Sequence, residues 1–176
     1  VDFKKNCLNK LKKKYYFFPL QTHTDSQVIV HSDYDSIEEF IEEVLISFSK
    51  YAREDKYLFF KHHPVDRGRK NYYKTISSLS KELKIDSRVR ILYDVHLPSL
   101  LKNAIGTIVI NSTVGLSSLY HKTPVKCMGK AIYDFEGITA KNISLNNFWN
   151  SELEVDSNFY LKFRSYLIKE TQINDN

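Results

Sequence analysis

The stretch GTIVINSTVGLSSLY, residues 106–120, contains the alternation that decides the fold. Its first five residues form an apolar run of strand length, and residues 114–120 have the pattern of a helix. The same alternation continues in both directions along the chain. Further strands are expected at 15–20, 57–61, 89–93 and 124–128, and further helices at 37–48, 72–83, 97–104 and 159–169. Short strands that are apolar on both faces and alternate with helices predict a parallel sheet covered on both sides.

The predicted fold class is therefore α/β, a Rossmann-like doubly wound parallel sheet. Its ligands are expected beyond the carboxyl ends of the strands, at a switch point in the strand order. Ser36 and Glu39 form a capping-box pattern that predicts the start of the helix after it. We divide the chain into a basic linker or fragment of a preceding domain at 1–14, the Rossmann-like domain at 15–150, and a helix and tail at 151–176.

Length and composition limit the possible classes of protein. The chain has 176 residues, a formal net charge of +5 and only two cysteines, which are too few for a disulfide framework and fit a reducing compartment. No apolar run approaches the roughly 18 residues of a membrane-spanning helix. The start lacks an initiator methionine and an apolar signal region, so we expect the chain to begin inside a longer product.

Residues 4–14 contain six lysines and no acidic residue. Such a run is most often a solvated face or linker. The alternative is a patch that attracts anionic lipid or a phosphorylated substrate. No nucleic-acid-binding signature accompanies the run, so we expect no nucleic-acid partner.

Two polar clusters follow predicted strands, where an α/β fold places its ligand. The first is KHHPVDRG at 61–68, in which Pro64 restrains the backbone of His63. The second is NST at 111–113, which enters a helix and offers hydroxyl and amide groups to an anion. Together they indicate a phosphate site, although a solvated loop and ordinary helix caps are the simpler alternatives. Because His62 and His63 are adjacent on extended chain and point to opposite sides, we expect no metal.

A third polar segment, PLQTHTDSQ at 19–27, contributes Gln21 and one carboxylate, Asp25. A retaining glycosyl transfer needs such a carboxylate as its nucleophile. The simpler alternative is that Asp25 caps the next turn.

These segments resemble a known family. The stretches at 61–68, 97–101 and 110–117, together with 129–134, 137–139 and 19–27, are similar to the capsule polysaccharide synthesis family. Its members are bacterial retaining β-Kdo transferases that build the linker joining group 2 capsules to phosphatidylglycerol. The resemblance covers about residues 15–150 and is stronger to the enzyme that adds the first Kdo than to the one that extends the linker.

The resemblance implies a GT-B glycosyltransferase of which this chain is the C-terminal, CMP-Kdo-binding half. It places His63, in the His-Pro pair with Pro64, on the CMP phosphate. Ser112 and Thr113 match the motif that binds the same nucleotide, and Lys61, Gln21 and Asn111 are further substrate-binding candidates. Asp25 and His63 are then the catalytic candidates. In related extending enzymes the segment that corresponds to 20–25 begins with a second Asp, and here that position is Leu20.

The implied donor is CMP-Kdo, with no cofactor, and the implied acceptor is an anionic lipid at the inner face of the bacterial inner membrane, on its cytoplasmic side. The N-terminal half of the protein is then a missing partner domain. The alternative function is a non-catalytic sugar-nucleotide or polysaccharide-binding component of capsule assembly or export.

Overall fold

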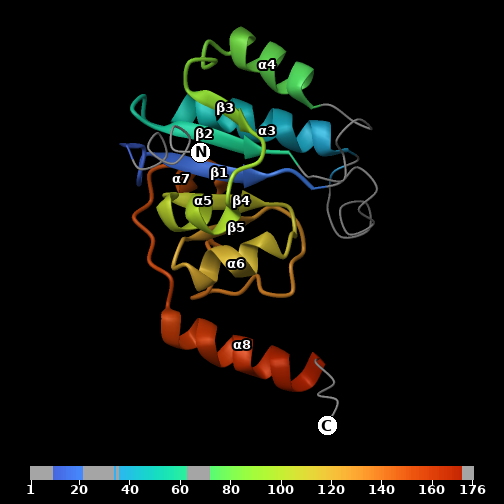
Figure 1. The fold of residues 1–176 in the computed structure, drawn as a ribbon, viewed down its shortest axis with the longest axis vertical. Coiled ribbons are helices and arrows are strands. Elements are labelled where there is room, and N and C mark those ends of the chain that lie inside the picture. The colour runs from blue at the N-terminus through green and yellow to red at the C-terminus, as the bar shows by residue number, and fades with distance from the viewer. Residues whose placement is uncertain (1–9, 22–33, 35, 63–71, 172–176) are drawn as a thin grey trace.

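The computed structural model describes residues 10–21, 34, 36–62 and 72–171, and it forms one sheet with helices on both faces (Figure 1). The strands are β1 (Tyr15–Pro19), β2 (Tyr57–Lys61), β3 (Val89–Leu92), β4 (Gly106–Val109) and β5 (Val125–Cys127). The helices are α3 (Ile37–Tyr51), α4 (Tyr73–Glu82), α5 (Leu97–Asn103), α6 (Val114–Tyr120), α7 (Leu145–Phe148) and α8 (Ser157–Thr171). Each expected strand and helix is present, with ends that differ by a few residues.

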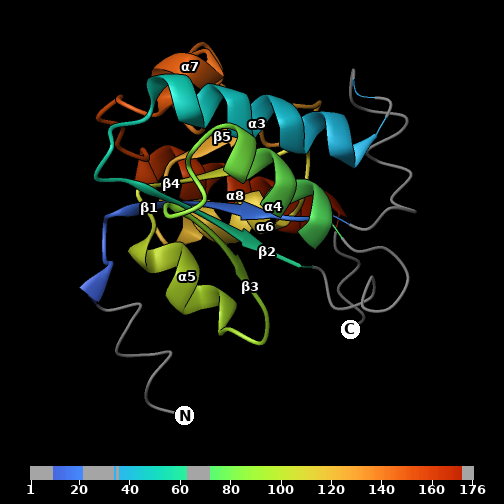
Figure 2. The ribbon, with the colours of Figure 1, turned by 90° about the horizontal axis from the view of Figure 1, so that it is seen from above.

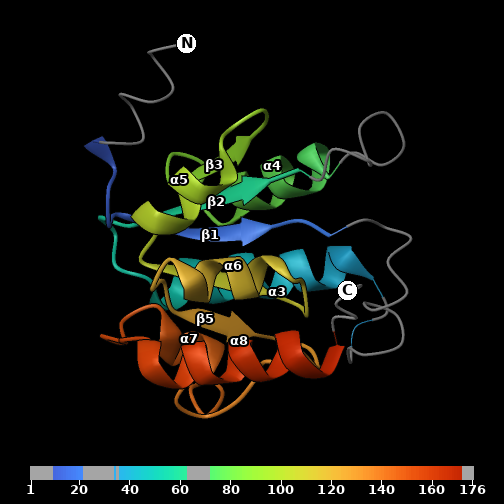
Figure 3. The same cartoon turned by 60° about the horizontal axis from the view of Figure 1, so that its bottom comes forward.

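The strands are parallel and lie in the order β3-β2-β1-β4-β5, and the arrows of β1, β2 and β5 point the same way in Figure 3. This order confirms the predicted Rossmann-like doubly wound sheet. The chain runs outward from β1 to β3 and then returns to place β4 on the other side of β1. The switch point therefore lies between the carboxyl ends of β1 and β4, where such folds bind their ligands.

The central strand β1 is buried along its whole length, as predicted for a strand covered on both faces. Tyr16 and Phe18 pack with α3, α4 and α7, while Tyr15 and Phe17 pack with α5. Figure 2 shows α3, α4 and α7 on one side of the sheet and α5 on the other. The alternation of side chains along a strand thus divides the aromatic residues of β1 between two cores.

The start of α3 follows the predicted capping pattern. The backbone N–H of Glu39 donates to the hydroxyl oxygen of Ser36 at 3.2 Å, and Ser36 itself has an extended backbone. This bond satisfies one of the N–H groups that the first turn of a helix leaves without a partner.

The short helix α7, which the sequence pattern did not predict, is fastened to the sheet through Trp149. The hydroxyl of Tyr16 donates to the carbonyl oxygen of Trp149, and the indole N–H of Trp149 donates to Ser47 on α3 at 2.7 Å. Ser47 in turn donates to Asn146 at 2.7 Å. Residues far apart in sequence therefore hold α7 against β1 and α3.

The last helix, α8, packs on the outside, as expected. Tyr160 is its buried residue, and the Tyr160 hydroxyl donates to the carbonyl oxygen of Leu116 on α6 at 2.9 Å. Asp156 precedes the helix and accepts from the backbone N–H of Phe159 at 2.9 Å. Within the described part of the chain, no helix has both the length and the apolarity that a membrane crossing requires.

We predict that Ser47→Ala destabilises the fold. The change leaves the buried indole N–H of Trp149 without its acceptor, at a cost of about 1–3 kcal/mol. For a chain of this size, thermal denaturation should give a melting temperature lower by about 2–4 °C per kcal/mol. Ser49→Ala on the same helix is the matched control, because the Ser49 hydroxyl bonds only within α3, to Ile46 at 2.8 Å. Equal melting temperatures for the two variants would contradict the proposed role of the Ser47 contact.

Candidate functional site

The switch point is closed by a pair of amide side chains. Gln21 follows β1, and Asn111 follows β4. The Gln21 Nε2 donates to Asn111 Oδ1 at 3.0 Å, and the backbone N–H of Asn111 donates to Gln21 Oε1 at 3.4 Å. Two residues that the sequence assigned to one substrate site therefore meet at the expected edge of the sheet. Gln21 is 6% exposed, so its main action here is to hold Asn111 in place.

Ser112 and Thr113 lie next to this pair, at the start of α6. The Ser112 hydroxyl oxygen accepts from the backbone N–H of Val114 at 3.2 Å, which leaves its O–H hydrogen available to a ligand. Thr113 is exposed and its side chain makes no capping hydrogen bond. Because α6 has only seven residues, we assign the polar character of this place to the two hydroxyl groups rather than to a helix dipole.

The neighbouring strand β2 brings Lys61 to the same edge. Lys61 is the last residue of β2 and pairs with Pro19, the last residue of β1. Its carbonyl oxygen accepts from the backbone N–H of Leu20 at 3.0 Å, so the two strand ends are joined. The structure thus places Lys61 beside the strand from which Gln21 comes.

His62 points into the protein rather than toward the edge. It is 5% exposed, and its ring centroid lies 5.9 Å from that of Tyr72 and 6.2 Å from that of Tyr93. The prediction that His62 and His63 cannot bind one ion together stays a prediction, because His63 lies outside the described residues. His63, Pro64 and Asp25, which the sequence assigned to phosphate binding and catalysis, lie outside the described residues. Among the described side chains, no three His, Cys, Asp or Glu residues gather as metal ligands would.

Tyr133 supports the Ser112 loop, a role that the sequence did not indicate. Its hydroxyl donates to the carbonyl oxygen of Ser112, and its ring packs against Gly115. A Cβ atom on Gly115 would lie 2.2 Å from the Tyr133 hydroxyl, so this residue must be glycine for the ring to fit. Gly115 and Tyr133 both lie in segments that resemble the capsule family, and this resemblance was the sequence feature that could have pointed to their role.

The thiol next to Tyr133 is not a nucleophile. Cys127 ends β5, and its burial raises the pKa of the thiol to about 12. A thiol with that pKa stays protonated near neutral pH, and only the thiolate is reactive. Burial likewise raises the pKa of Tyr133, so its hydroxyl keeps the proton that it donates to Ser112.

A family model described as "Capsule polysaccharide biosynthesis protein" matches residues 2–176. The chain belongs to this family. Among the capsule proteins that it resembles, the capsule polysaccharide export protein KpsS of Escherichia coli is 41% identical over 167 residues, which is 95% of this chain and 43% of that protein. The capsule polysaccharide modification protein LipB of Neisseria meningitidis serogroup A is 42% identical over 164 residues, which is 93% of this chain and 39% of that protein. The chain thus spans less than half the length of these relatives.

Two solved structures share the fold. KpsC of Thermosulfurimonas dismutans, described as a beta Kdo 2,7 transferase, superimposes with a TM-score of 0.55 at 18% identity, over 84% of this chain and 50% of that one. S. aureus TarM, solved with UDP bound, gives a TM-score of 0.54 at 10% identity, over 92% of this chain and 33% of that one. At these identities the capsule-family chain shares an architecture with both proteins.

We predict that Tyr133→Phe loosens the Ser112 loop without disrupting the core. The ring that fills the space beside Gly115 remains, whereas the carbonyl oxygen of Ser112 loses one of its two donors and keeps the backbone N–H of Gly115 at 2.9 Å. A lost hydrogen bond of this kind costs about 0.5–1.5 kcal/mol. Hydrogen exchange should speed up at Val114 and Gly115 and stay unchanged at α3. Gly115→Ala should cost more, about 1–3 kcal/mol, because the added methyl group overlaps the ring. If the exchange rates at residues 114–115 are the same in the Tyr133→Phe variant as in the wild type, Tyr133 does not hold the loop.

Proposed function

We propose that this chain is the donor-binding part of a retaining glycosyltransferase of capsule synthesis, which transfers Kdo from CMP-Kdo to a phosphatidylglycerol-type lipid at the inner face of the bacterial inner membrane. The observation that carries the proposal is the Gln21–Asn111 pair at the switch point, with the hydroxyl groups of Ser112 and Thr113 beside it. The family to which the chain belongs, and the Kdo transferase whose fold it shares, support the capsule context and the transferase class.

The proposed donor site binds phosphate through fixed donors. Ser112 and Thr113 supply O–H donors, and Lys61 supplies a cation from the adjacent strand end. We add His63 from the resemblance of its His-Pro pair. CMP is a good leaving group, so the protein must bind its phosphate and stabilise the charge that develops as the glycosidic bond breaks. Donors fixed to strand ends can do this without a metal ion.

Retention of configuration requires two displacements at the anomeric carbon. In the first, the carboxylate of Asp25 would form a bond to the anomeric carbon while the bond from that carbon to the CMP phosphate oxygen breaks, and the electron pair leaves with CMP. In the second, a hydroxyl oxygen of the lipid acceptor would attack the same carbon, release Asp25 and give its proton to a base. We propose that the acceptor binds to the part of the protein that this chain does not contain.

We predict that CMP binding depends on Ser112, in the loop between β4 and α6, and on His63, which follows β2 in the sequence. A charge-assisted contact to phosphate contributes roughly 1.5–3 kcal/mol, so Ser112→Ala and His63→Ala should each weaken CMP binding about ten- to a hundredfold. Calorimetric titration with CMP measures this effect, and circular dichroism checks the fold. Ser117→Ala, at an exposed position of α6, is the control and should bind normally. If both site variants fold and bind CMP as tightly as the wild type, the donor site lies elsewhere.

We also predict that Asp25→Asn abolishes transfer while the protein remains folded. The amide keeps the shape of the side chain but cannot act as the nucleophile, so Kdo transfer from CMP-Kdo to a phosphatidylglycerol-type acceptor should fall by several orders of magnitude. A residue that only caps a turn would instead cost about 0.5–2 kcal/mol of stability. The assay uses a full-length protein that contains this chain, with the melting temperature measured in parallel.

The outcomes of this assay are distinct. A variant that keeps more than about a tenth of the rate, which is a barrier change of less than roughly 1.4 kcal/mol, would mean that Asp25 is not the nucleophile. A wild-type protein that binds CMP but transfers nothing would support the non-catalytic alternative, a sugar-nucleotide-binding component of capsule assembly or export.

A further inference from the structure

A polar cavity lies at the edge of the sheet opposite the switch point, beside the amino ends of the strands. Its volume is about 570 Å³, and Tyr16, Ile105 and Pro124 lie in its wall at the starts of β1, β4 and β5. Strands of this length, at about 3.3 Å per residue, place it roughly 16 Å from the switch point. The proposed donor site does not use this cavity.

Four basic residues line the cavity, and each precedes or follows a different structural element. They are Lys13 before β1, Arg53 after α3, Lys56 before β2 and Lys122 after α6. Three carboxylates lie nearby. Glu152 and Glu154 are exposed residues of the cavity wall. Asp55 forms ion pairs with Arg53 at 3.2 Å and with Lys56 at 2.9 Å. Cations outnumber carboxylates, so the cavity favours an anionic ligand.

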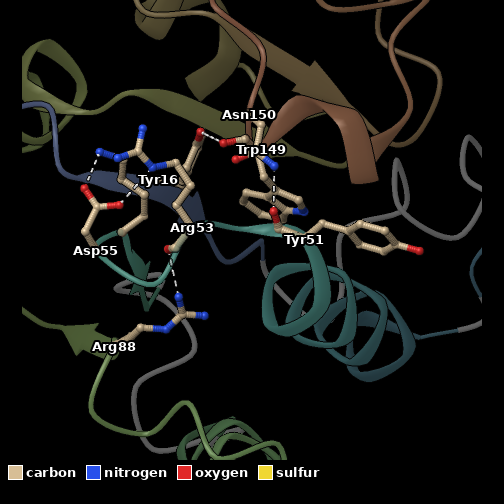
Figure 4. Close-up of polar contacts among 8 residues, drawn as sticks. Tyr16, Tyr51, Arg53, Asp55, Arg88, Trp149 and Asn150 are labelled. Atoms are coloured by element: carbon tan, nitrogen blue, oxygen red, sulfur yellow. Dashed lines mark hydrogen bonds and ion pairs between the residues drawn. The ribbon is translucent and has the colours of Figure 1, made fainter.

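The loop that carries Arg53 is fixed from both sides. Arg88 donates to the carbonyl oxygen of Arg53 at 2.8 Å, and Asn150 donates to that of Tyr51 at 2.6 Å. Figure 4 shows the Arg53–Asp55 pair and these backbone contacts, with Trp149 drawn next to Tyr51 and Asn150. The cationic side chain therefore projects from a backbone that is already ordered, which lowers the entropy cost of binding.

Lys122 occupies a position at which glycine is the usual residue. It follows α6 with φ 58°, in the left-handed region. The N–H of Lys122 donates to Leu119, and the N–H of Thr123 donates to Ser118, which are the two bonds of a helix-ending turn that favours glycine. A lysine here bears backbone strain that glycine would not have.

We propose that this cavity is a second anion site, which binds the phosphate group of a ligand through Lys13, Arg53, Lys56 and Lys122. The ligand is either a soluble phosphate ester or the headgroup of an anionic phospholipid. The proposal does not rest on the donor site at the other edge of the sheet, and the two can fail separately.

Lys84 provides a matched control for a test at Lys122. It follows α4 with φ 58° and makes the same pair of turn bonds, from its own N–H to Lys81 and from Ile85 to Ser80, but it does not line the cavity. Lys122→Gly and Lys84→Gly remove the same charge and relieve the same strain, so both variants should fold at least as stably as the wild type.

Trp149 reports binding at this site, because it lines the cavity and is the single tryptophan of the sequence. We expect glycerol 3-phosphate to shift its indole N–H resonance in a saturable manner. Lys122→Gly should weaken the apparent affinity about fivefold, as expected for the loss of one solvent-exposed charge contact of about 1 kcal/mol, and Lys84→Gly should not change it.

A second arm distinguishes the two sources of phosphate. If the ligand is a lipid headgroup, the wild-type protein cosediments with phosphatidylglycerol vesicles but not with phosphatidylcholine vesicles. This cosedimentation should be lost in Lys122→Gly and kept in Lys84→Gly. Saturable binding of glycerol 3-phosphate alone would identify a soluble ester. Neither response in the wild type, or equal losses in the two variants, would overturn the proposal.

Discussion

Tyr15 and Tyr16 bring two hydroxyl groups into the interior of the protein, where each needs an acceptor. The Tyr15 hydroxyl donates to the carbonyl oxygen of Leu100 on α5 at 2.7 Å, and the Tyr16 hydroxyl donates to that of Trp149. Because adjacent residues of a strand face opposite ways, these two bonds fasten the central strand to a layer on each face of the sheet. Burial raises the pKa of Tyr16 to about 12, so its hydroxyl stays protonated and able to donate. The strand around which the sheet is built is therefore held by side-chain hydrogen bonds on both of its faces.

The order of strands could be expected from the sequence in outline, because apolar runs and helical segments alternate from residue 15 onward. The stretch at 106–120 gave both a strand and a helix in nearly their observed positions. Helix α7 could not be expected, since it has four residues and depends on Ser47 and Trp149, which are distant in sequence. The left-handed backbone at Lys122 was equally hidden, because the residue type that marks such a turn is glycine.

In the candidate site, too, the features that depend on nearby residues could be predicted, whereas contacts between residues distant in sequence could not. Gln21 and Asn111 each follow a strand in the sequence, and Lys61 ends one. Parallel strands bring their carboxyl ends to one edge, so the common location of these residues was predictable. The hydrogen bonds between Gln21 and Asn111 were not, because they depend on how β1 and β4 align. Tyr133 was not assigned a role, because its contact with Ser112 joins two loops. The spacing of apolar residues along the chain gives no indication of such a contact.

The two edges of the sheet differ in how their polar groups are fixed, and this difference bears on their chemistry. At the carboxyl edge, Asn111 and Ser112 are held by Gln21 and Tyr133, both buried, so their positions are set before a ligand arrives. Such preorganisation suits a reaction, because donors that are already in place need not be reorganised as charge develops. At the amino edge, Arg53 and Lys122 are exposed side chains that extend from fixed turns, and Arg53 pairs with Asp55 at 3.2 Å. Exposed cations of that kind suit recognition of an anion more than stabilisation of a transition state, since water and salt weaken each contact. The architecture therefore places a polar edge held by buried, hydrogen-bonded side chains and a solvent-exposed cationic edge on opposite sides of one sheet.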